Sequence, residues 1–125
     1  MVLSSQQAKK NRRIGAKFAH KVRSDFEELG WTVSKWQNNV DLEKSEICPA
    51  KGNRFMMRTL GFPDFVMFKR KEQDYELMLV ECKFAGKLSK DEREKIAVLK
   101  GRGFKCFLAY NDDGETAYTV LYRRL

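Results

Sequence analysis

Two apolar runs that carry acids at matching positions constrain this chain more than any other feature of its sequence. Residues 62–70 and residues 75–84 each read as a β-strand, with a short polar turn between them. When the strands pair so that their apolar residues face one another, Asp64 lies opposite Glu81, and a slip of one residue would turn Asp64 to the other face. That register also pairs Arg70 with Tyr75, Phe68 with Leu77, and Val66 with Leu79. The pattern therefore predicts a hairpin that brings two carboxylates together above an apolar stripe.

The end of the second strand adds an amine to the two acids. Side chains two apart on a strand point to the same face, so Glu81 and Lys83 share a side and Cys82 faces away. Opposed residues have Cβ atoms roughly 5 Å apart, and carboxylate oxygens can then reach one divalent metal at about 2.1 Å. A solvated salt pair at the end of a hairpin is the alternative interpretation. Charged residues seldom lie in apolar strands for solubility alone, so the convergence favours a functional site.

At these residues the sequence resembles the PD-(D/E)XK nuclease superfamily. Pro63-Asp64 is similar to the first half of the family signature, and Glu81-Cys82-Lys83 is similar to the second half. Gly61 before the first motif, and Leu88-Ser89 opening a helix after the second, resemble the VRR-NUC branch and the neighbouring Holliday junction resolvases. The resemblance implies an α/β fold with a restriction-endonuclease-like core, in which helices flank a mixed central β-sheet in the order α-β-β-β-α-β-β.

The same resemblance implies roles for individual residues. In the family the Asp and the Glu hold Mg²⁺, the main-chain carbonyl between Glu and Lys adds a ligand, and the Lys positions the attacking water. These roles fall on Asp64, Glu81, the carbonyl of Cys82, and Lys83, and Mn²⁺ is expected to substitute for Mg²⁺. The implied activity is a metal-dependent DNA endonuclease of repair or recombination, selective for junctions, flaps or branched DNA. The alternative is a non-catalytic DNA-binding module that keeps the nuclease fold.

The sequence leaves the identity of a further acidic residue open. VRR-NUC members usually carry a Gln in the helix after the Glu-x-Lys, and Glu92 stands at the matching position here. Glu92 also completes a capping box with Ser89, so it has both a structural and a catalytic interpretation. Resolvase-like members place an acid early in the first helix, where this chain has none. Asp25, which flanks the apolar seam of that helix, is a second candidate. Further acids lie in the segment after it: Asp41, Glu43 and Glu46.

The charge distribution points to a polyanionic partner. The chain has 25 Lys and Arg against 17 Asp and Glu, a formal net charge of +8, and its cations run through residues 9–23 without an acid among them. Such a run is often only a solvated face, but beside a nuclease-like motif it favours neutralisation of DNA phosphates. Residues 38–60 show no period and read as a long loop that is expected to contact substrate. The DNA-binding candidates are Lys9, Lys10, Arg12, Arg13 and Lys17 in the first segment, and Lys51, Arg54 and Arg58 in the loop.

Length and composition predict one small domain. The chain has 125 residues, of which 42% are hydrophobic, enough to fill a single core. Residues 1–10 are expected to form a flexible basic tail and residues 11–125 the nuclease domain. No apolar run approaches the roughly 20 residues that a membrane span needs, so we expect no membrane contact and a cytoplasmic location. A domain without a separate DNA-reading part is expected to form a homodimer. His20 is the only histidine, which argues against Ser-His-Asp or Cys-His catalysis.

The remaining elements follow from periodicity and capping signals. The first helix is expected over residues 11–29, ended by Gly30, and an edge strand over residues 31–37. A second helix should begin at the capping box and end at Gly101 or Gly103, before strands at residues 104–110 and 116–122. The apolar seam of the first helix comprises Ala19, Val22, Phe26 and Leu29.

Overall fold

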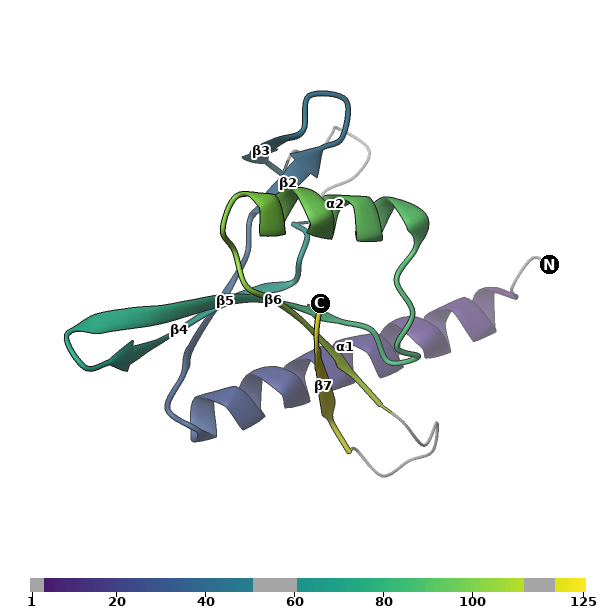
Figure 1. Ribbon diagram of the computed structural model, residues 1–125. Helices are drawn as coiled ribbons and strands as arrows, with labels where there is room; N and C mark the ends of the chain where they lie inside the picture. The colour runs from purple at the N-terminus through teal and green to yellow at the C-terminus, as the bar shows by residue number, and fades with distance from the viewer. Residues whose placement is uncertain (1–3, 51–60, 112–118) are drawn as a thin grey trace.

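A mixed five-stranded sheet lies between two helices in the computed structural model, which describes residues 4–50, 61–111 and 119–125 (Figure 1). The strand order is β1-β4-β5-β6-β7, and strands β2 and β3 form a separate two-stranded sheet. The elements are α1 (Ser5–Glu28), β1 (Thr32–Lys35), β2 (Asn38–Asp41), β3 (Glu46–Pro49), β4 (Phe65–Lys71), β5 (Asp74–Cys82), α2 (Lys90–Gly101), β6 (Cys106–Tyr110) and β7 (Leu121–Arg124). Strands β5 and β6 are parallel, with α2 between them in the chain, and the other pairs are antiparallel. The predicted α/β class and mixed central sheet are confirmed.

The register of the β4–β5 hairpin is the predicted one. Val66 pairs with Leu79, and Phe68 pairs with Leu77. The β4–β5 ladder ends where Phe65 pairs with Val80, so Asp64 and Glu81 are the next opposed positions. The apolar match between the strands favours this register, because a slip of one residue would turn the side chains of one strand to its other face.

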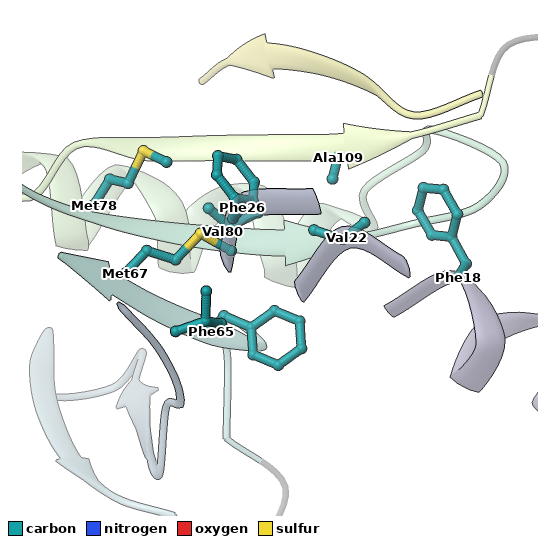
Figure 2. Packing of buried hydrophobic residues seen from close by; sticks show 9 residues of the cluster. Phe18, Val22, Phe26, Phe65, Met67, Met78, Val80 and Ala109 are labelled. Carbon is teal, nitrogen blue, oxygen red and sulfur yellow. The ribbon is translucent and has the colours of Figure 1, made fainter. Parts of the chain in front are cut away.

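The second half of strand β5 is buried on both faces, and each helix covers one of them. Val80 packs in the cluster under α1 together with Phe18, Val22 and Phe26, as Figure 2 shows. Leu79, the next residue on the opposite face, packs with Ile96 and Leu99 of α2. Residues 78–81 are covered on both sides, so a charged residue there loses hydration, whereas residues 74–77 are exposed or half-buried.

Helix α1 begins earlier than predicted, and its seam was partly misassigned. Ser4 caps it at the N-terminus and Ser5 is already helical, so the part of the expected tail that the structure describes belongs to the helix. Phe18 is buried where the sequence interpretation placed no core residue, and Leu29 is 63% exposed. Leu29 is exposed because the helix ends there, where Gly30 takes a φ of +92° and the chain turns away.

Residues 38–50 were wrongly assigned to a long loop. The structure forms a small hairpin there, in which Val40 pairs with Ile47. Strands this short carry too few residues to show a period of two, although Val40 is buried in the cluster under α2. Residues 51–60 of that expected loop, with Lys51, Arg54 and Arg58, lie outside the described residues.

Other strand boundaries differ by a few residues from the predicted ones. Strand β1 is shorter than the expected run at residues 31–37 but lies at the sheet edge as predicted. Strand β4 begins at Phe65 rather than Phe62, and β6 begins at Cys106 rather than Phe104. The final strand runs over Leu121–Arg124 rather than residues 116–122, and of that expected range residues 116–118 lie outside the described residues. Within the described ranges, neither helix is long and apolar enough to cross a membrane.

The segment before β4 is fixed against the chain that leaves β1. The amide of Phe62 donates to the carbonyl of Asn38 at 2.8 Å, and the amide of Trp36 donates to the carbonyl of Asp64 at 3.0 Å. Between these bonds, Gly61 lies so close to the carbonyl of Trp36 that a Cβ atom would collide with it. The approach requires glycine and sets the position of Asp64.

Gly61→Ala should therefore destabilise the fold by roughly 1–3 kcal/mol, because the backbone must shift to relieve the collision. Gly101→Ala is the matched control, since a Cβ atom there meets nothing within 4 Å and the position is helical. That variant should be neutral or up to about 1 kcal/mol more stable. Urea unfolding midpoints measure both, and equal midpoints would contradict the close approach.

Candidate active site

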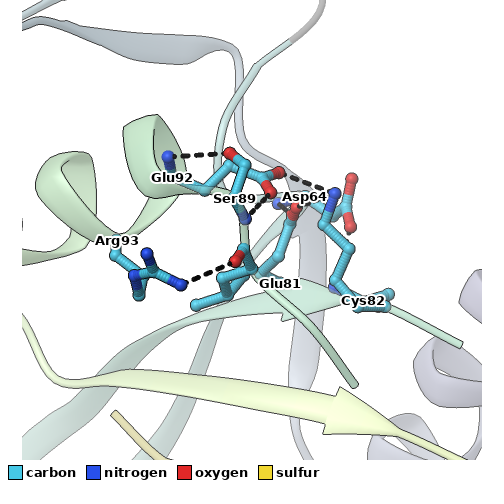
Figure 3. Close-up of polar contacts among 8 residues, drawn as sticks. Asp64, Glu81, Cys82, Ser89, Glu92 and Arg93 are labelled. Atoms are coloured by element: carbon cyan, nitrogen blue, oxygen red, sulfur yellow. Dashed lines mark hydrogen bonds and ion pairs between the residues drawn. The ribbon is translucent and has the colours of Figure 1, made fainter. Parts of the chain in front are cut away.

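Asp64 and Glu81 hold each other across the end of the β4–β5 hairpin. The amide of Asp64 donates to Oε1 of Glu81 at 3.1 Å, and the amide of Cys82 donates to Oδ2 of Asp64 at 2.8 Å (Figure 3). Each carboxylate thus accepts a hydrogen bond from the strand of the other. We call this arrangement the acid clamp. It places two acids side by side where β4 begins and β5 ends.

Burial gives Glu81 unusual electrostatics. Glu81 is only 4% exposed to solvent. Burial, followed by the charge of Asp64 and hydrogen bonding to it, raises the pKa of Glu81 to about 10, although Lys83 acts in the opposite direction. The ammonium of Lys83 lies 3.7 Å from Oε2 of Glu81, which confirms that the two side chains share a face. Without a bound cation, Glu81 therefore holds a proton at neutral pH.

Glu92 joins Lys83 to helix α2. Its Oε1 accepts from the amide of Ser89 at 2.8 Å, while its Oε2 lies 2.6 Å from Nζ of Lys83. The structural and the catalytic interpretations of Glu92 are thus compatible, because one oxygen completes the capping box and the other contacts Lys83. Burial disfavours its charge, but bonds from Lys83 and Ser89 outweigh this and lower the pKa of Glu92.

The same ion pair fixes the charge of Lys83. Burial alone lowers its pKa, but the hydrogen bond to Glu92 and the charges of Glu81 and Glu92 outweigh it, so the pKa of Lys83 is raised. Lys83 therefore remains an ammonium at neutral pH. An ammonium donates hydrogen bonds and does not accept protons, so Lys83 can orient a water or a phosphate oxygen rather than act as a base.

Cys82 contributes its backbone to the site rather than its thiol. The side chain packs against the cluster under α1, away from Lys83, as the alternation predicted. Burial and then the charges of Asp64 and Glu81 raise the pKa of this thiol, so it stays protonated and is a poor nucleophile or metal ligand. Its amide serves the acid clamp.

A metal at this point would need oxygen ligands beyond side chains. Among the residues that the structure describes, no three His, Cys, Asp or Glu side chains are grouped to hold an ion. Two adjacent carboxylates suit Mg²⁺, which usually keeps several waters and takes only one or two protein carboxylates. Asp64, Glu81 and a main-chain carbonyl at Cys82 fit that pattern.

The other predicted residues lie apart from the acid clamp. Asp25 pairs with Lys21 at 2.9 Å on α1. Ala19 is the last residue of α1 that lines the cleft beside Asp64. Asp25 lies six residues further, a distance of about 9 Å along the helix axis. The structure does not bring Asp25 to the site. The basic candidates on α1 are exposed residues of its N-terminal half, which extends beyond the sheet in Figure 1: Lys9, Lys10, Arg12, Arg13 and Lys17.

One cation near the site was missed by the sequence analysis. Lys35, at the end of β1, lines the cleft beside Asp64. The edge strand that carries Lys35 was predicted correctly. The strand with which it pairs was not predicted, so the place of Lys35 beside Asp64 could not be inferred. Once β1 pairs with β4, Lys35 lies opposite Phe65, the neighbour of Asp64.

A sheet of this topology with an acid clamp and a lysine at the end of one hairpin defines a class of protein, the PD-(D/E)XK-like nuclease domain. The family follows from the sequence: the VRR-NUC domain model matches residues 16–113, and the chain belongs to that family. The match includes every residue of the acid clamp together with Lys83 and Glu92. Searches among curated proteins and among solved structures gave no significant match. Nuclease activity and DNA binding follow from family membership.

The raised pKa of Glu81 predicts a specific pH dependence of stability in metal-free protein. The folded state keeps a proton that the unfolded state releases above its ordinary pKa of 4.5, so this group lowers the free energy of unfolding as pH rises from there toward 10. Glu81→Gln removes the effect, and its stability relative to wild type should increase steadily across that window. Urea unfolding with a chelator measures this. Glu94→Gln, at an exposed position of α2, is the control, and parallel curves for wild type and Glu81→Gln would contradict the assignment.

Glu92 should affect cleavage through Lys83 and not through helix capping. Glu92→Ala removes both contacts and should lower the cleavage rate tenfold or more, since a displaced catalytic group can cost about 10²-fold. Ser89→Ala removes the hydroxyl that accepts from the amide of Glu92, which costs about 1 kcal/mol of helix stability. It should leave the rate close to wild type. Glu92→Gln keeps an acceptor for Lys83 and should retain most activity. Equal losses of cleavage rate in Ser89→Ala and Glu92→Ala would show that Glu92 acts only through helix capping.

Proposed function

We propose that this chain is a metal-dependent DNA endonuclease that hydrolyses phosphodiester bonds, with Asp64, Glu81 and Lys83 as its catalytic residues. The observation that carries the proposal is the acid clamp, with the ammonium of Lys83 3.7 Å from Glu81 on the same face. Membership of the VRR-NUC family supports the activity. The buried Glu81 and the half-buried Asp64 disfavour each other's charge, so the fold tolerates a cost that an additional cation would remove.

The proposed cofactor is Mg²⁺, with Mn²⁺ as a substitute, held by Asp64, Glu81 and the carbonyl of Cys82. When bound, such an ion lowers the pKa of a water and offsets negative charge on the phosphate. Lys83 orients the attacking water and adds positive charge near the phosphate oxygens. Glu92 keeps the Lys83 side chain in one place, because its Oε2 accepts from the ammonium while α2 anchors its other oxygen.

Selectivity for junctions, flaps or other branched DNA is the finer part of the proposal. Its support is the exposed basic half of α1, which extends beyond the sheet and carries no acid before Asp25 (Figure 1). Cations there bind backbone rather than bases, so they favour DNA shape over sequence. The proposal also includes a cytoplasmic location.

A homodimer is proposed on different grounds. The β4–β5 hairpin projects from the body of the domain in Figure 1 and exposes Tyr75 and Leu77, which are 66% and 42% accessible. Phe68 lies opposite Leu77 and stacks edge-on to Tyr75. Apolar residues gathered on a projecting element are typical of a contact surface.

The alternative function is a DNA-binding module without catalysis. The acid clamp argues against it, since a scaffold gains nothing from two adjacent carboxylates of which one is 4% exposed. Apolar or amide residues would fill the same space at lower cost. Activity assays separate the two functions directly.

Asp64→Asn, Glu81→Gln and Lys83→Met should each reduce cleavage by at least about 10²-fold, because the three groups act as a unit. The assay follows labelled duplex, single-stranded, flap and four-way junction DNA with Mg²⁺, with Mn²⁺ and with a chelator. Binding of the same DNA should change little in Glu81→Gln and Lys83→Met. Asp25→Asn is the matched control and should keep the wild-type rate, because Asp25 pairs with Lys21 away from the site. DNA binding by wild type without cleavage of any substrate would favour the binding module.

A further inference from the structure

A cleft opens beside Asp64 on the face of the sheet that α1 covers. Its volume is about 490 Å³, within the range of roughly 300–1,000 Å³ typical of small-ligand sites. The α1 wall consists of small residues, which leave space between the helix and the end of the sheet. The lining residues are Gly15, Ala16, Ala19, Lys35, Asp64, Phe65 and Cys82. The cleft is therefore continuous with the acid clamp but lies around the sheet end from Lys83.

Lys35 is the cation of this cleft. It pairs with Phe65 across β1 and β4, so both side chains lie on the α1 face, and the strands are about 4.8 Å apart. Val33, two residues earlier on the same face, is buried under α1, so Lys35 stands where the covering helix leaves the sheet. Lys35 is exposed and makes no ion pair with any residue that the structure describes.

Unpaired positive charge continues from the cleft along α1. A second hollow, lined by Lys9, Arg12, Arg13 and Ala16, meets the cleft at Ala16. Residues 5–17 precede the first buried residue of the helix, Phe18, and span about 20 Å. Cations in this region have no acid on the same helix nearer than Asp25. The helix N-terminus carries partial positive charge of its own, so a polyanion would relieve repulsion there.

We propose that Lys35 and the small-residue wall of α1 form a second phosphate-binding subsite, which holds the nucleotide adjacent to the scissile phosphate. The proposal rests on the proposed nuclease function and deepens it by giving the path of the substrate strand. With the scissile phosphate at the acid clamp, the strand passes around the sheet end, places its next phosphate on Lys35 and continues along the basic half of α1. The exposed apolar surface of Ala16 contacts the sugar. Lys83 then acts at the scissile phosphate, and Lys35 binds the adjacent one.

The test is a double-mutant cycle that combines a substitution in the protein with the neutralisation of one phosphate in the DNA. Single methylphosphonates, which lack the phosphate charge, are placed at each position around the mapped cleavage site of an oligonucleotide. Lys35→Met should raise KM roughly tenfold with little change in kcat, as loss of a charge-assisted hydrogen bond does. One flanking methylphosphonate should cost wild type a similar factor and cost Lys35→Met nothing further, because the pair interacts directly.

Two variants make the test specific. Lys71→Met removes the same charge from an exposed residue that pairs with Asp74. It lies seven residues from Asp64, about 23 Å along the strand, and it should retain the wild-type response to every methylphosphonate. Ala16→Leu fills the cleft at an exposed helical position and should raise KM without unfolding the protein. An unchanged KM in Lys35→Met, or a methylphosphonate response equal to that of Lys71→Met, would overturn the subsite.

Failure of the nuclease function would be visible separately. If wild type cleaves no DNA, binding of the same oligonucleotide replaces cleavage as the measurement. Lys35→Met should then bind more weakly, and the slope of log affinity against log salt should fall by nearly one, as for one lost phosphate contact. If Lys71→Met shows neither change, the subsite is supported independently of cleavage. Equal affinities of the two variants would contradict it.

Discussion

Two crossed hydrogen bonds between β4 and β5 determine where the rest of the candidate site lies. Through them, Asp64 accepts from the amide of Cys82 and Glu81 accepts from the amide of Asp64. Both carboxylates replace part of their lost hydration with strand amides, which is what allows acids to remain at the end of a doubly covered strand. The clamp in turn needs the segment before β4 to lie against Trp36, and Gly61 permits that approach. A local backbone requirement thus fixes the distance between the acids.

Helix α2 contributes to the same site through its first turn. It follows β5 directly and crosses to the parallel strand β6, so its N-terminus comes beside the end of β5. Glu92 uses this position to satisfy an amide of the helix start and the ammonium of Lys83 together. The charges near the clamp are therefore balanced in pairs: Lys83 by Glu92 on the α2 side, and the buried Glu81 by a proton or by a cation. A site organised this way changes its protonation when an ion binds.

The sequence predicted the hairpin register and the placing of Asp64 beside Glu81, but not the elements that surround them. The apolar match of Val66 and Phe68 with Leu79 and Leu77 excludes a slip of one residue. The opposition of Asp64 and Glu81 follows from that register. The capping box at Ser89 was equally local and was predicted correctly. The short β2–β3 hairpin was missed because four-residue strands carry little periodicity, and its burial depends on α2, far away in sequence. Lys35 was missed for a similar reason, since its place beside Phe65 depends on a strand pairing that no local pattern encodes.

Local patterns also did not determine how far the buried seam of α1 extends along the helix. The apolar seam predicted contact at Val22 and Phe26 correctly, but the end of the seam depends on where the sheet stops. Phe18 packs edge-on against Phe84 at that point, and the residues before it have no sheet to cover. The basic residues that read as a flexible tail are helical from Ser5 onward. Their positive charge was predicted from the sequence, but their helical conformation was not.

Proton release on metal binding tests the central claim most directly. Glu81 holds a proton in the metal-free protein, since its pKa is raised to about 10 by burial beside Asp64, and an ion bound between the two acids must displace it. Calorimetric titration of Mn²⁺ in buffers of different ionisation enthalpy counts the protons. Wild type should release about one proton per ion bound at neutral pH, and Glu81→Gln should release none. Mn²⁺ binding without proton release, or binding that survives unchanged in both Asp64→Asn and Glu81→Gln, would contradict it.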